Sequence, residues 1–323
     1  MGLFGRMVVG MLPVMPRFLV RFIAKRYVAG SDLESAVACM RRLESEGACF
    51  TVDVLGEEIT TLAEANDFLN EYERLLDAIV EHRLDANISI KPTAFGLLID
   101  ESVALDNIER LLRKATAHDI FVRVDMEDHR VTQATIDVVL SMHQRGLANI
   151  GTVLQARLHR TPADIDSISE ALGRDADFRI CKGIYLESAA IAHTRYPTIV
   201  EAMNDCIDRM LDSGAYVAIA SHDTPVIEHA EAALAARGIR DDADPREPSP
   251  ERRPGKGAGH EFQMLLGVRG DVRRRLAGLG HRTRVYVPYG ERWYEYSIRR
   301  LRENPDIAWH VTKAMLLPWT NRR

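Results

Sequence analysis

The stretch NISIKPTAFGLLIDESVALDNIERLLRKATAHDIFVRVD (Asn87–Asp125) contains two short β-rich runs separated by a helical pattern. The runs are NISIK (Asn87–Lys91) and FVRVD (Phe121–Asp125), and Leu105–His118 between them has the apolar spacing of an amphipathic helix. Because two strands joined by a helical crossover pair in parallel, this stretch predicts a β–α–β unit.

The same alternation continues along the chain in both directions. Eight β-rich runs occur, at Cys49–Leu55, Asn87–Lys91, Phe121–Asp125, Gly151–Gln155, Phe178–Lys182, Tyr216–Ser221, Glu261–Leu265 and Arg284–Pro288. Further amphipathic stretches long enough for crossover helices include Leu62–Leu84, Thr132–Arg145 and Ser188–Leu211. Eight such units in 323 residues favour a closed barrel over an open doubly wound sheet. We therefore expect an α/β protein, a distorted (βα)8 TIM barrel at residues 49–323, preceded by extra amino-terminal helices at residues 1–48.

One segment interrupts this alternation. Residues 240–260 contain four prolines, three glycines and many charges, with only two alanines to offer a core. A segment of this composition cannot bury apolar surface, so it is expected to form a disordered loop inserted in the barrel.

The overall charge and the cysteines restrict the partners and the compartment. The 42 basic and 47 acidic residues give a net charge of −5, so nucleic acid is not an expected partner. Four cysteines without CxxC spacing fit a reducing compartment, and a cytoplasmic location follows. The first thirty residues are basic and apolar. Within them, Arg17–Tyr27 has the pattern either of an interfacial helix at the inner face of the membrane or of a helix docked on the protein's own core.

Chemically capable side chains follow the predicted strands. In a TIM barrel the active site lies at the carboxyl ends of the strands, where this chain has Lys91, Asp125, Glu127, Asp128, Gln155, Arg157, Arg179, Lys182, Ser221, His222, Asp223 and Tyr286. Two enzyme classes fit such a rim. A metal site could use the acidic residues with His129 and His222, although no HxH or HExxH pair is present. A class I aldolase could form a Schiff base on Lys91 or Lys182.

The last predicted helix adds a feature that neither class explains. Trp293, Tyr296 and Arg300 recur at helical spacing, and Arg299 stands beside Arg300 in YEYSIRRLRENP. If this face covers the barrel mouth, the two guanidinium groups can grip a carboxylate. A small carboxylate-bearing substrate is therefore expected.

Seven segments lie in order along the chain: ISIKPTAFG, RVDMED, VLQARLHRT, FRICKGIYLES, IASHD, EFQMLLGVR and RVYVPYGERWYEYSIRRLRENP. In these segments and in their order the chain resembles the proline dehydrogenase family. It implies oxidation of L-proline to Δ1-pyrroline-5-carboxylate, the first step of proline catabolism to glutamate, with FAD as cofactor and a quinone as electron acceptor at the membrane surface.

The resemblance also implies a substrate site. Lys91, Arg299 and Arg300 would hold the proline carboxylate, Tyr286 would pack against the pyrrolidine ring, and Leu265 would help form the apolar wall. A tyrosine at position 286 is typical of proline-oxidising members, whereas hydroxyproline dehydrogenases tend to have a smaller residue there. A catalytically silent scaffold that binds a small amino acid would be free to lose some of the residues Asp125, Arg179, Lys182, Arg299 and Arg300, and all five are present.

For the flavin, the resemblance implies contacts from the ends of several strands. They involve the backbone around Met126 and residues Gln155, Arg179, Ile180, Lys182, Gly183, Ile184, Ser221 and His222. Arg179 would stabilise negative charge on the reduced ring, and Asp125 would orient the charged groups beside it. The reaction implied is hydride transfer from proline C5 to flavin N5. Ser221 replaces the family's usual threonine and keeps the hydroxyl group. Arg157 stands where the family usually has an aromatic residue, which puts local packing near the flavin in doubt.

Overall fold

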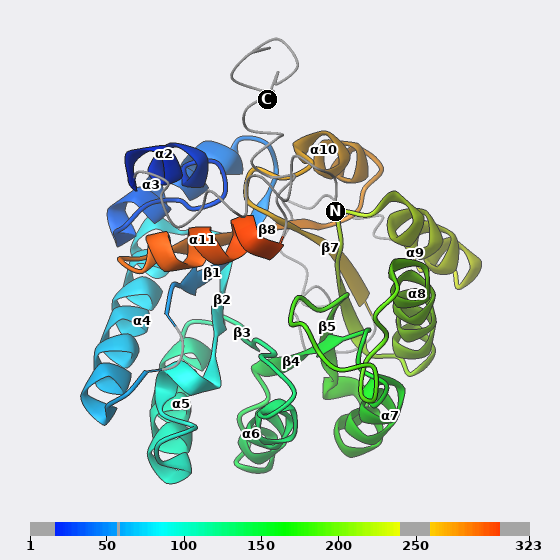
Figure 1. The fold of residues 1–323 in the computed structure, drawn as a ribbon, viewed down its shortest axis with the longest axis horizontal. Coiled ribbons are helices and arrows are strands. Elements are labelled where there is room, and N and C mark those ends of the chain that lie inside the picture. Colours follow the sequence, from blue (N-terminus) through cyan, green and yellow to red (C-terminus); the bar gives the residue numbers. More distant parts are fainter. Residues whose placement is uncertain (1–16, 57–58, 240–258, 304–323) are drawn as a thin grey trace.

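The structure is a computed structural model that describes residues 17–56, 59–239 and 259–303. Strands and helices alternate through most of this range (Figure 1). In chain order the elements are α2 (Arg17–Ala24), α3 (Leu33–Glu44), β1 (Cys49–Val54), α4 (Leu62–His82), β2 (Ala86–Ile90), η2 (Pro92–Phe95), α5 (Glu101–Thr116), β3 (Val122–Val124), α6 (Thr132–Gln144), β4 (Ile150–Gln155), α7 (Thr161–Leu172), η3 (Gly173–Asp175), β5 (Asp177–Cys181), α8 (Tyr196–Asp212), β6 (Tyr216–Ala220), α9 (Thr224–Ala236), β7 (Gly259–Leu265), α10 (Gly270–Gly278), β8 (Thr283–Tyr289) and α11 (Trp293–Glu303).

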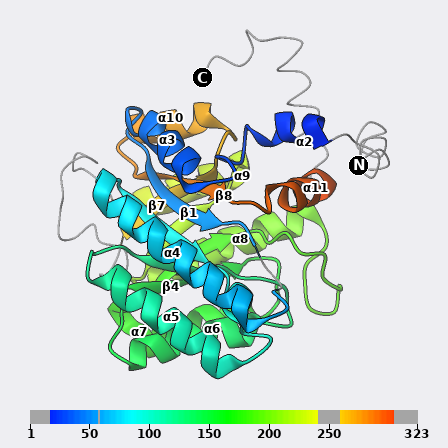
Figure 2. The same ribbon diagram turned by 90° about the vertical axis from the view of Figure 1, so that its left-hand side faces the viewer.

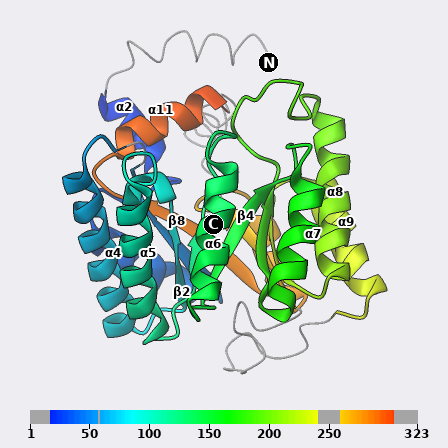
Figure 3. The ribbon, with the colours of Figure 1, turned by 90° about the horizontal axis from the view of Figure 1, so that it is seen from below.

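The strands form a closed parallel barrel. Each strand pairs with the next one in the chain, and β8 returns to β1 in a register that runs from Cys49 opposite Arg284 to Val54 opposite Tyr289. Helices α4 to α9 surround the strands on the outside (Figure 3). All eight predicted strands are present, and the expectation of a (βα)8 barrel is confirmed.

Local sequence signals set where several helices begin. Thr61 and Glu64 form a capping box at the start of α4, and Asp100 caps α5 by accepting a hydrogen bond from the Val103 amide (3.2 Å). Helices α7, α8 and α9 each have a proline in the first turn, where its missing N–H costs no hydrogen bond.

The helix expected over Ser188–Leu211 begins eight residues later than predicted. Residues 188–195 lie in the loop between β5 and α8, where the His193 amide donates to the Arg157 carbonyl oxygen (2.7 Å) and Ala192 bridges to Leu158. These links hold the segment against the loop after β4. Tyr196 and the proline that follows it then start the helix.

The two ends of the described chain meet around β8. Helix α3 precedes the barrel, yet its buried residues Val37 and Met40 belong to the same apolar cluster as Val285 and Val287 of β8. The helix after β8, α11, crosses in front of β1 and β8 and lies beside α2 (Figures 1 and 2). The covering position beside the last strand is thus filled by α3, which leaves α11 to cover the barrel mouth.

Buried ion pairs fill the amino-terminal half of the barrel. Arg123 pairs with Asp177, and Arg284 pairs with Glu261 through two hydrogen bonds of 2.8 and 3.0 Å. Although burial raises the pKa of Glu261, the guanidinium of Arg284 prevails and lowers it to about 2. Such buried ion pairs act as core, which leaves the carboxyl half of the barrel for chemistry.

Two further expectations concern the inserted loop and the membrane. The loop expected at residues 240–260 lies outside the described residues except for Gly259 and His260, which are the first residues of β7. Among the described helices, none is long and apolar enough to cross a membrane.

Candidate active site

Asp125 is the centre of a hydrogen-bonded group at the carboxyl ends of the strands. Its Oδ1 accepts from Arg179 (2.6 Å) and from the Ser89 hydroxyl (2.7 Å). Its Oδ2 accepts from the Tyr286 hydroxyl (2.8 Å) and lies 3.9 Å from Lys91 Nζ. These four partners come from β2, β5 and β8 and the residue after β2, so Asp125 joins distant parts of the barrel. Three of the residues predicted from sequence, Lys91, Arg179 and Tyr286, are brought together around it.

Lys91 has a second and closer carboxylate. Its Nζ donates to Asp53 Oδ1 at 2.6 Å, and the Tyr72 hydroxyl lies 3.5 Å from the same oxygen. Asp53 is fully buried. Burial raises its pKa, while Lys91 acts in the opposite direction. The carboxylates of Asp53 and Asp125 therefore hold the Lys91 ammonium group in place at the carboxyl end of the barrel.

The guanidinium of Arg179 lies between Asp125 and the aromatic ring of Tyr286. Its carbon is 5.4 Å from the ring centroid, while one terminal nitrogen is 3.5 Å from Thr51 Oγ1. Burial, with the negative charges of Asp125 and Asp53, holds the pKa of Tyr286 well above its ordinary value. Tyr286 is therefore a neutral donor at physiological pH, and Arg179 remains paired beneath an apolar ring face.

Several buried polar atoms in this region have no hydrogen-bond partner among the described residues, and they include Nε of Arg179, Oε1 of Gln155 and Oδ2 of Asp53. Gln155 Nε2 donates to the Glu127 carbonyl oxygen (2.7 Å). Gly183 faces the same amide with φ +91°, and a β-carbon there would come within 2.5 Å of Gln155 Oε1. The Arg179 Nε donor and the Gln155 Oε1 acceptor, with Gly183 leaving space beside the amide, fit a planar cofactor ring that forms hydrogen bonds.

The end of β6 is tied to β7 through His222. Its Nε2 accepts a hydrogen bond from the Leu265 amide (3.0 Å), so the ring is neutral with its proton on Nδ1. Burial lowers the pKa of His222 to about 4. The Ser221 hydroxyl accepts from the Asp223 amide (3.1 Å), and the Asp223 carboxylate pairs with Lys182. The predicted flavin residues at β5 and β6 thus form one connected rim.

The remaining predicted residues are placed less favourably. Met126 is buried directly after Asp125. Ile180 belongs to the apolar cluster that joins β4–β6 to their helices, which leaves only its backbone for a ligand. Ile184 is 41% exposed. Arg299 and Arg300 lie in α11 over the mouth, but their side chains are outside the described residues.

The acidic and histidine residues considered for a metal site are divided among separate contacts. Glu127 accepts from Thr93, His129 pairs with Glu187 (2.6 Å), and Asp128 pairs with Arg130. The described part of the chain contains no group of three or more histidine, cysteine or acidic side chains placed to hold a metal ion. The two lysines considered for a Schiff base both form ion pairs, with Asp53 and Asp223.

Sequence reasoning did not find Asp53, Thr51, Ser89 or Tyr72. We inspected residues that close each strand, whereas Thr51, Asp53 and Ser89 lie inside β1 and β2. A signal was present, because a carboxylate within the apolar run CFTVDVL needs a buried partner.

The comparison with known families decides the assignment. A family model described as proline dehydrogenase matches residues 36–313, which is most of the chain. The chain belongs to the proline dehydrogenase family. It is 36% identical over 296 residues to proline dehydrogenase 1 of Bacillus subtilis (strain 168), covering 92% of this chain and 91% of that protein. It is 33% identical over 298 residues to the proline dehydrogenase of Deinococcus radiodurans, covering 91% and 90%. An oxidoreductase acting on proline is the activity that this similarity supports.

Solved structures agree with the fold of a proline dehydrogenase. The crystal structure of proline utilization A from Bdellovibrio bacteriovorus, inactivated by N-propargylglycine, has a TM-score of 0.76 at 22% identity. The match covers 87% of this chain and 32% of that one, so the chain spans about a third of the larger protein. This likeness confirms the barrel architecture.

Proposed function

We propose that this protein oxidises L-proline to Δ1-pyrroline-5-carboxylate with FAD as cofactor, as the first step of proline catabolism to glutamate. The observation that carries the proposal is the group around Asp125, which brings Lys91, Arg179 and Tyr286 together beneath α11. A cationic anchor, an aromatic ring and a paired guanidinium in one buried site fit a small amino acid held beside a redox ring.

The substrate carboxylate is assigned to the cations at the mouth. Lys91 is already oriented by Asp53, and Arg299 and Arg300 are carried on the helix that covers the site. Cationic hydrogen bonds to a carboxylate are strong and directional. With the carboxylate clamped, the ring of Tyr286 packs against the pyrrolidine ring and fixes its orientation, which is the principal contribution that the barrel makes.

FAD, when bound, supplies the acceptor for the hydride that leaves proline C5. Arg179, Lys182, Gln155, Gly183, Ser221 and His222 would hold it, together with backbone around Met126, Ile180 and Ile184. The free Nε of Arg179 and the free Oε1 of Gln155 are suited to the polar edge of a flavin ring. Asp125 keeps Arg179 in place, so the positive charge is fixed before the reaction begins.

The proline nitrogen has to be uncharged for its lone pair to assist loss of hydride. Both oxygens of Asp125 are occupied as acceptors. Asp53 accepts from Lys91 through Oδ1 and is fully buried within β1. We therefore propose that proline binds as the free amine or loses its proton to water, and not to a dedicated base.

We also propose that a membrane quinone reoxidises the enzyme, which would be cytoplasmic and peripherally bound at the inner membrane face. In α2, the buried Val20 faces the protein while Phe22 is 51% exposed beside the exposed Arg21 and Lys25. In the β5–α8 loop at the same end of the barrel, Leu186 is 97% exposed. Replacing Phe22 and Leu186 by serine should weaken vesicle binding and leave dye-linked activity; unchanged binding would remove this part of the proposal.

An absorbance spectrum of the purified protein tests the cofactor and substrate. Flavin bands that bleach on anaerobic addition of L-proline, and not with trans-4-hydroxy-L-proline, are expected. A colourless protein that takes up no flavin when FAD is supplied would overturn the proposal and restore the metal and Schiff-base alternatives.

A further inference from the structure

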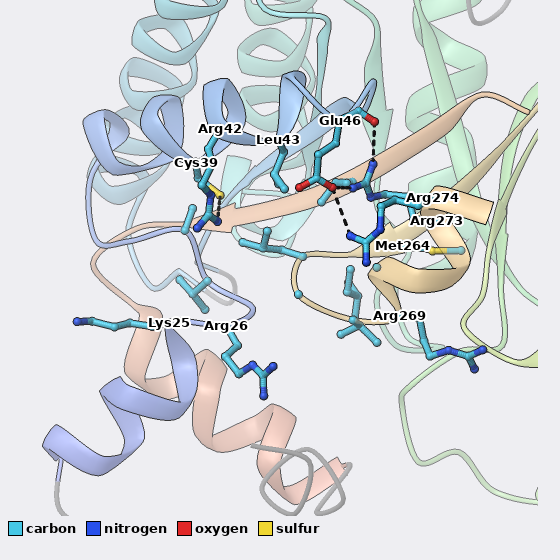
Figure 4. A pocket seen from close by; sticks show the side chains of 18 of the residues that line it. Lys25, Arg26, Cys39, Arg42, Leu43, Glu46, Met264, Arg269, Arg273 and Arg274 are labelled. Atoms are coloured by element: carbon cyan, nitrogen blue, oxygen red, sulfur yellow. Dashed lines mark hydrogen bonds and ion pairs between the residues drawn. The ribbon is translucent and has the colours of Figure 1, made fainter. Parts of the chain in front are cut away.

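A cavity of about 1020 Å³ lies between α3 and α10, on the helix side of β7 and β8 (Figure 4). We call it the α3–α10 cleft. Its floor includes Met264, Leu266 and Val285, and its walls are α3, the chain after α2, and the β7–α10 loop with the first turn of α10. None of the residues of the group around Asp125 lines it, whereas Leu265, expected in the apolar wall of the substrate site, lies at its border.

The side chains that line the cleft are mostly cationic. Six cations face two carboxylates, and these eight residues are Lys25, Arg26, Arg42, Arg269, Arg273 and Arg274 with Glu46 and Asp271. The surplus of four positive charges, six minus two, contrasts with the chain's net charge of −5. A concave surface lined by one sign of charge concentrates oppositely charged ligands.

The two carboxylates do not neutralise the cleft. Glu46 pairs with Arg273 and lies 3.5 Å from Arg274, and Asp271 lies 3.7 Å from Arg269. Within the part of the chain that the structure describes, the Arg42 side chain makes a weak contact of 3.9 Å to Cys39 Sγ. In Figure 4, Arg273 and Arg274 lie with Glu46 on one side of the cleft, and Lys25 and Arg26 lie on the other. Positive groups therefore approach an occupant from several directions.

The start of α10 adds backbone donors to this charge. No side chain caps the helix, whose first residues Gly270 and Asp271 line the cleft after the left-handed Arg269 (φ +48°). The first N–H groups of a helix have no partner within it, and they carry the positive end of its dipole. Guanidinium forks next to such amides match the oxygens of a phosphate group better than a single carboxylate.

The backbone geometry keeps the two walls together. Gly267 (φ +72°) lies directly under the backbone of Arg26, where a β-carbon would come within 1.9 Å of the Arg26 carbonyl oxygen. The chain after α2 is thus packed closely against the β7–α10 loop, and the two walls of the cleft meet at this point.

We propose that the α3–α10 cleft binds a small polyanion of the phosphate or pyrophosphate class, independently of the proposed oxidation of proline. The concave form fits a discrete small ligand better than a flat lipid surface. Phosphate groups can also be presented by anionic lipids, so the test has to separate the two sources.

Isothermal titration calorimetry of the full-length protein with sodium pyrophosphate at low ionic strength tests the proposal. Wild type is expected to bind one equivalent, with affinity that falls as salt is added. The double variant Arg42→Ala/Arg274→Ala should bind at least tenfold more weakly. The matched control Arg110→Ala/Arg113→Ala removes the same charge from exposed ion pairs on α5 and should leave affinity unchanged.

A charge-preserving variant separates binding from folding. Arg42→Lys/Arg274→Lys should retain most of the affinity, and the melting curve of each variant checks that it is folded. Equal pyrophosphate affinity in the cleft and control variants, or no binding by wild type, would overturn the proposal. Loss of flotation with anionic phospholipid vesicles in the cleft variant, without pyrophosphate binding by wild type, would also overturn it, in favour of a lipid surface.

Discussion

Asp125 accepts hydrogen bonds from three side chains, whereas Asp53 holds Lys91 by a single short contact. Loss of the Asp125 carboxylate would therefore affect several side chains, whereas loss of the Asp53 carboxylate would mainly affect Lys91. Two of the donors to Asp125, Arg179 and Ser89, also contact each other at 3.1 Å. Asp53 supplies the nearest negative charge to a lysine that is 8% exposed.

Replacing Asp53 by asparagine should leave Lys91 without its closest counter-charge. A buried charge that loses its partner costs about 2–5 kcal/mol, and the lysine would reorient toward Asp125. We expect a lower melting temperature and a higher KM for proline, with flavin content unchanged. The control is Asp77→Asn, because Asp77 pairs with Lys114 on the surface. Wild-type KM and melting temperature in Asp53→Asn would contradict this role.

Tyr286 allows its two functions to be separated. Tyr286→Phe keeps the ring but removes the hydrogen bond to Asp125. We expect kcat/KM for proline to fall, which corresponds to a loss of about 1–2 kcal/mol of transition-state stabilisation. Tyr286→Ser removes the ring and opens space, and should raise the relative rate with trans-4-hydroxy-L-proline. Steady-state kinetics with both substrates measure the ratio. An unchanged ratio in the serine variant would mean that another residue sets the specificity.

Four residues of the site were predicted from sequence, and the structure places them together. Lys91 and Asp125 directly follow β2 and β3, as expected, whereas Arg179 and Tyr286 lie inside β5 and β8. Asp53 and Thr51 were missed because their inward orientation depends on the barrel register, which one sequence does not reveal. The roles assigned to Arg299 and Arg300 stay predictions, since their side chains lie outside the described residues.

At the level of elements, His222 joins the end of β6 to β7 and does so only when neutral. Its pKa is lowered to about 4 by burial, whereas in the unfolded chain it would be close to 6.5. The unfolded state therefore binds the proton more readily. The stability from neutral His222 is complete above pH 6.5 and is lost as the pH falls toward 4.

Urea unfolding at two pH values measures this contribution. Between pH 7.5 and pH 5 the free energy of unfolding should fall by about 2 kcal/mol through His222. His222→Asn should show a smaller fall, because asparagine keeps an acceptor for the Leu265 amide but does not titrate. His118→Asn, at an exposed position, is the control. Identical pH dependence in wild type and His222→Asn would exclude the link.

The packing of α2 on α11 predicts a second effect at this scale. Val20 is fully buried in α2, and Tyr27 lies 6.4 Å from Tyr296 of α11 between ring centroids. Val20→Asp would bury an unpaired carboxylate and should detach α2 at a cost of about 2–4 kcal/mol. We expect faster proteolysis near α2 and a higher KM, because α11 loses its support. Phe22→Asp, at an exposed site, should change neither quantity with a soluble dye as acceptor.

For the whole molecule, the barrel could be predicted because the count of strand–helix units did not depend on any one strand. The boundaries were less predictable. Ser188–Arg195 reads as helix from its composition, but contacts with the loop after β4 hold it in another conformation. The position of α3 was also hidden, because nothing local in its sequence indicates that its partner is the last strand.

Two truncations test how far α3 is part of the barrel. A chain starting at residue 46 loses Val37 and Met40, whose burial contributes about 3–6 kcal/mol, and exposes the outer face of β8. It should aggregate or bind a hydrophobic dye. A chain starting at residue 31 keeps α3 and should remain folded and monodisperse in size-exclusion chromatography. Equal solubility of both chains would make α3 dispensable.

The pairing of β1 with β8 and of α3 with the same last strand also has a consequence during translation. A nascent chain that has not yet released Thr283–Tyr289 from the ribosome has already synthesised α3 and β1, and neither can yet pack against or pair with β8. The apolar side of α3 and one edge of β1 then stay exposed until more than five sixths of the 323 residues have emerged. Chaperone demand should accordingly peak late in synthesis and end abruptly once the eighth strand leaves the exit tunnel.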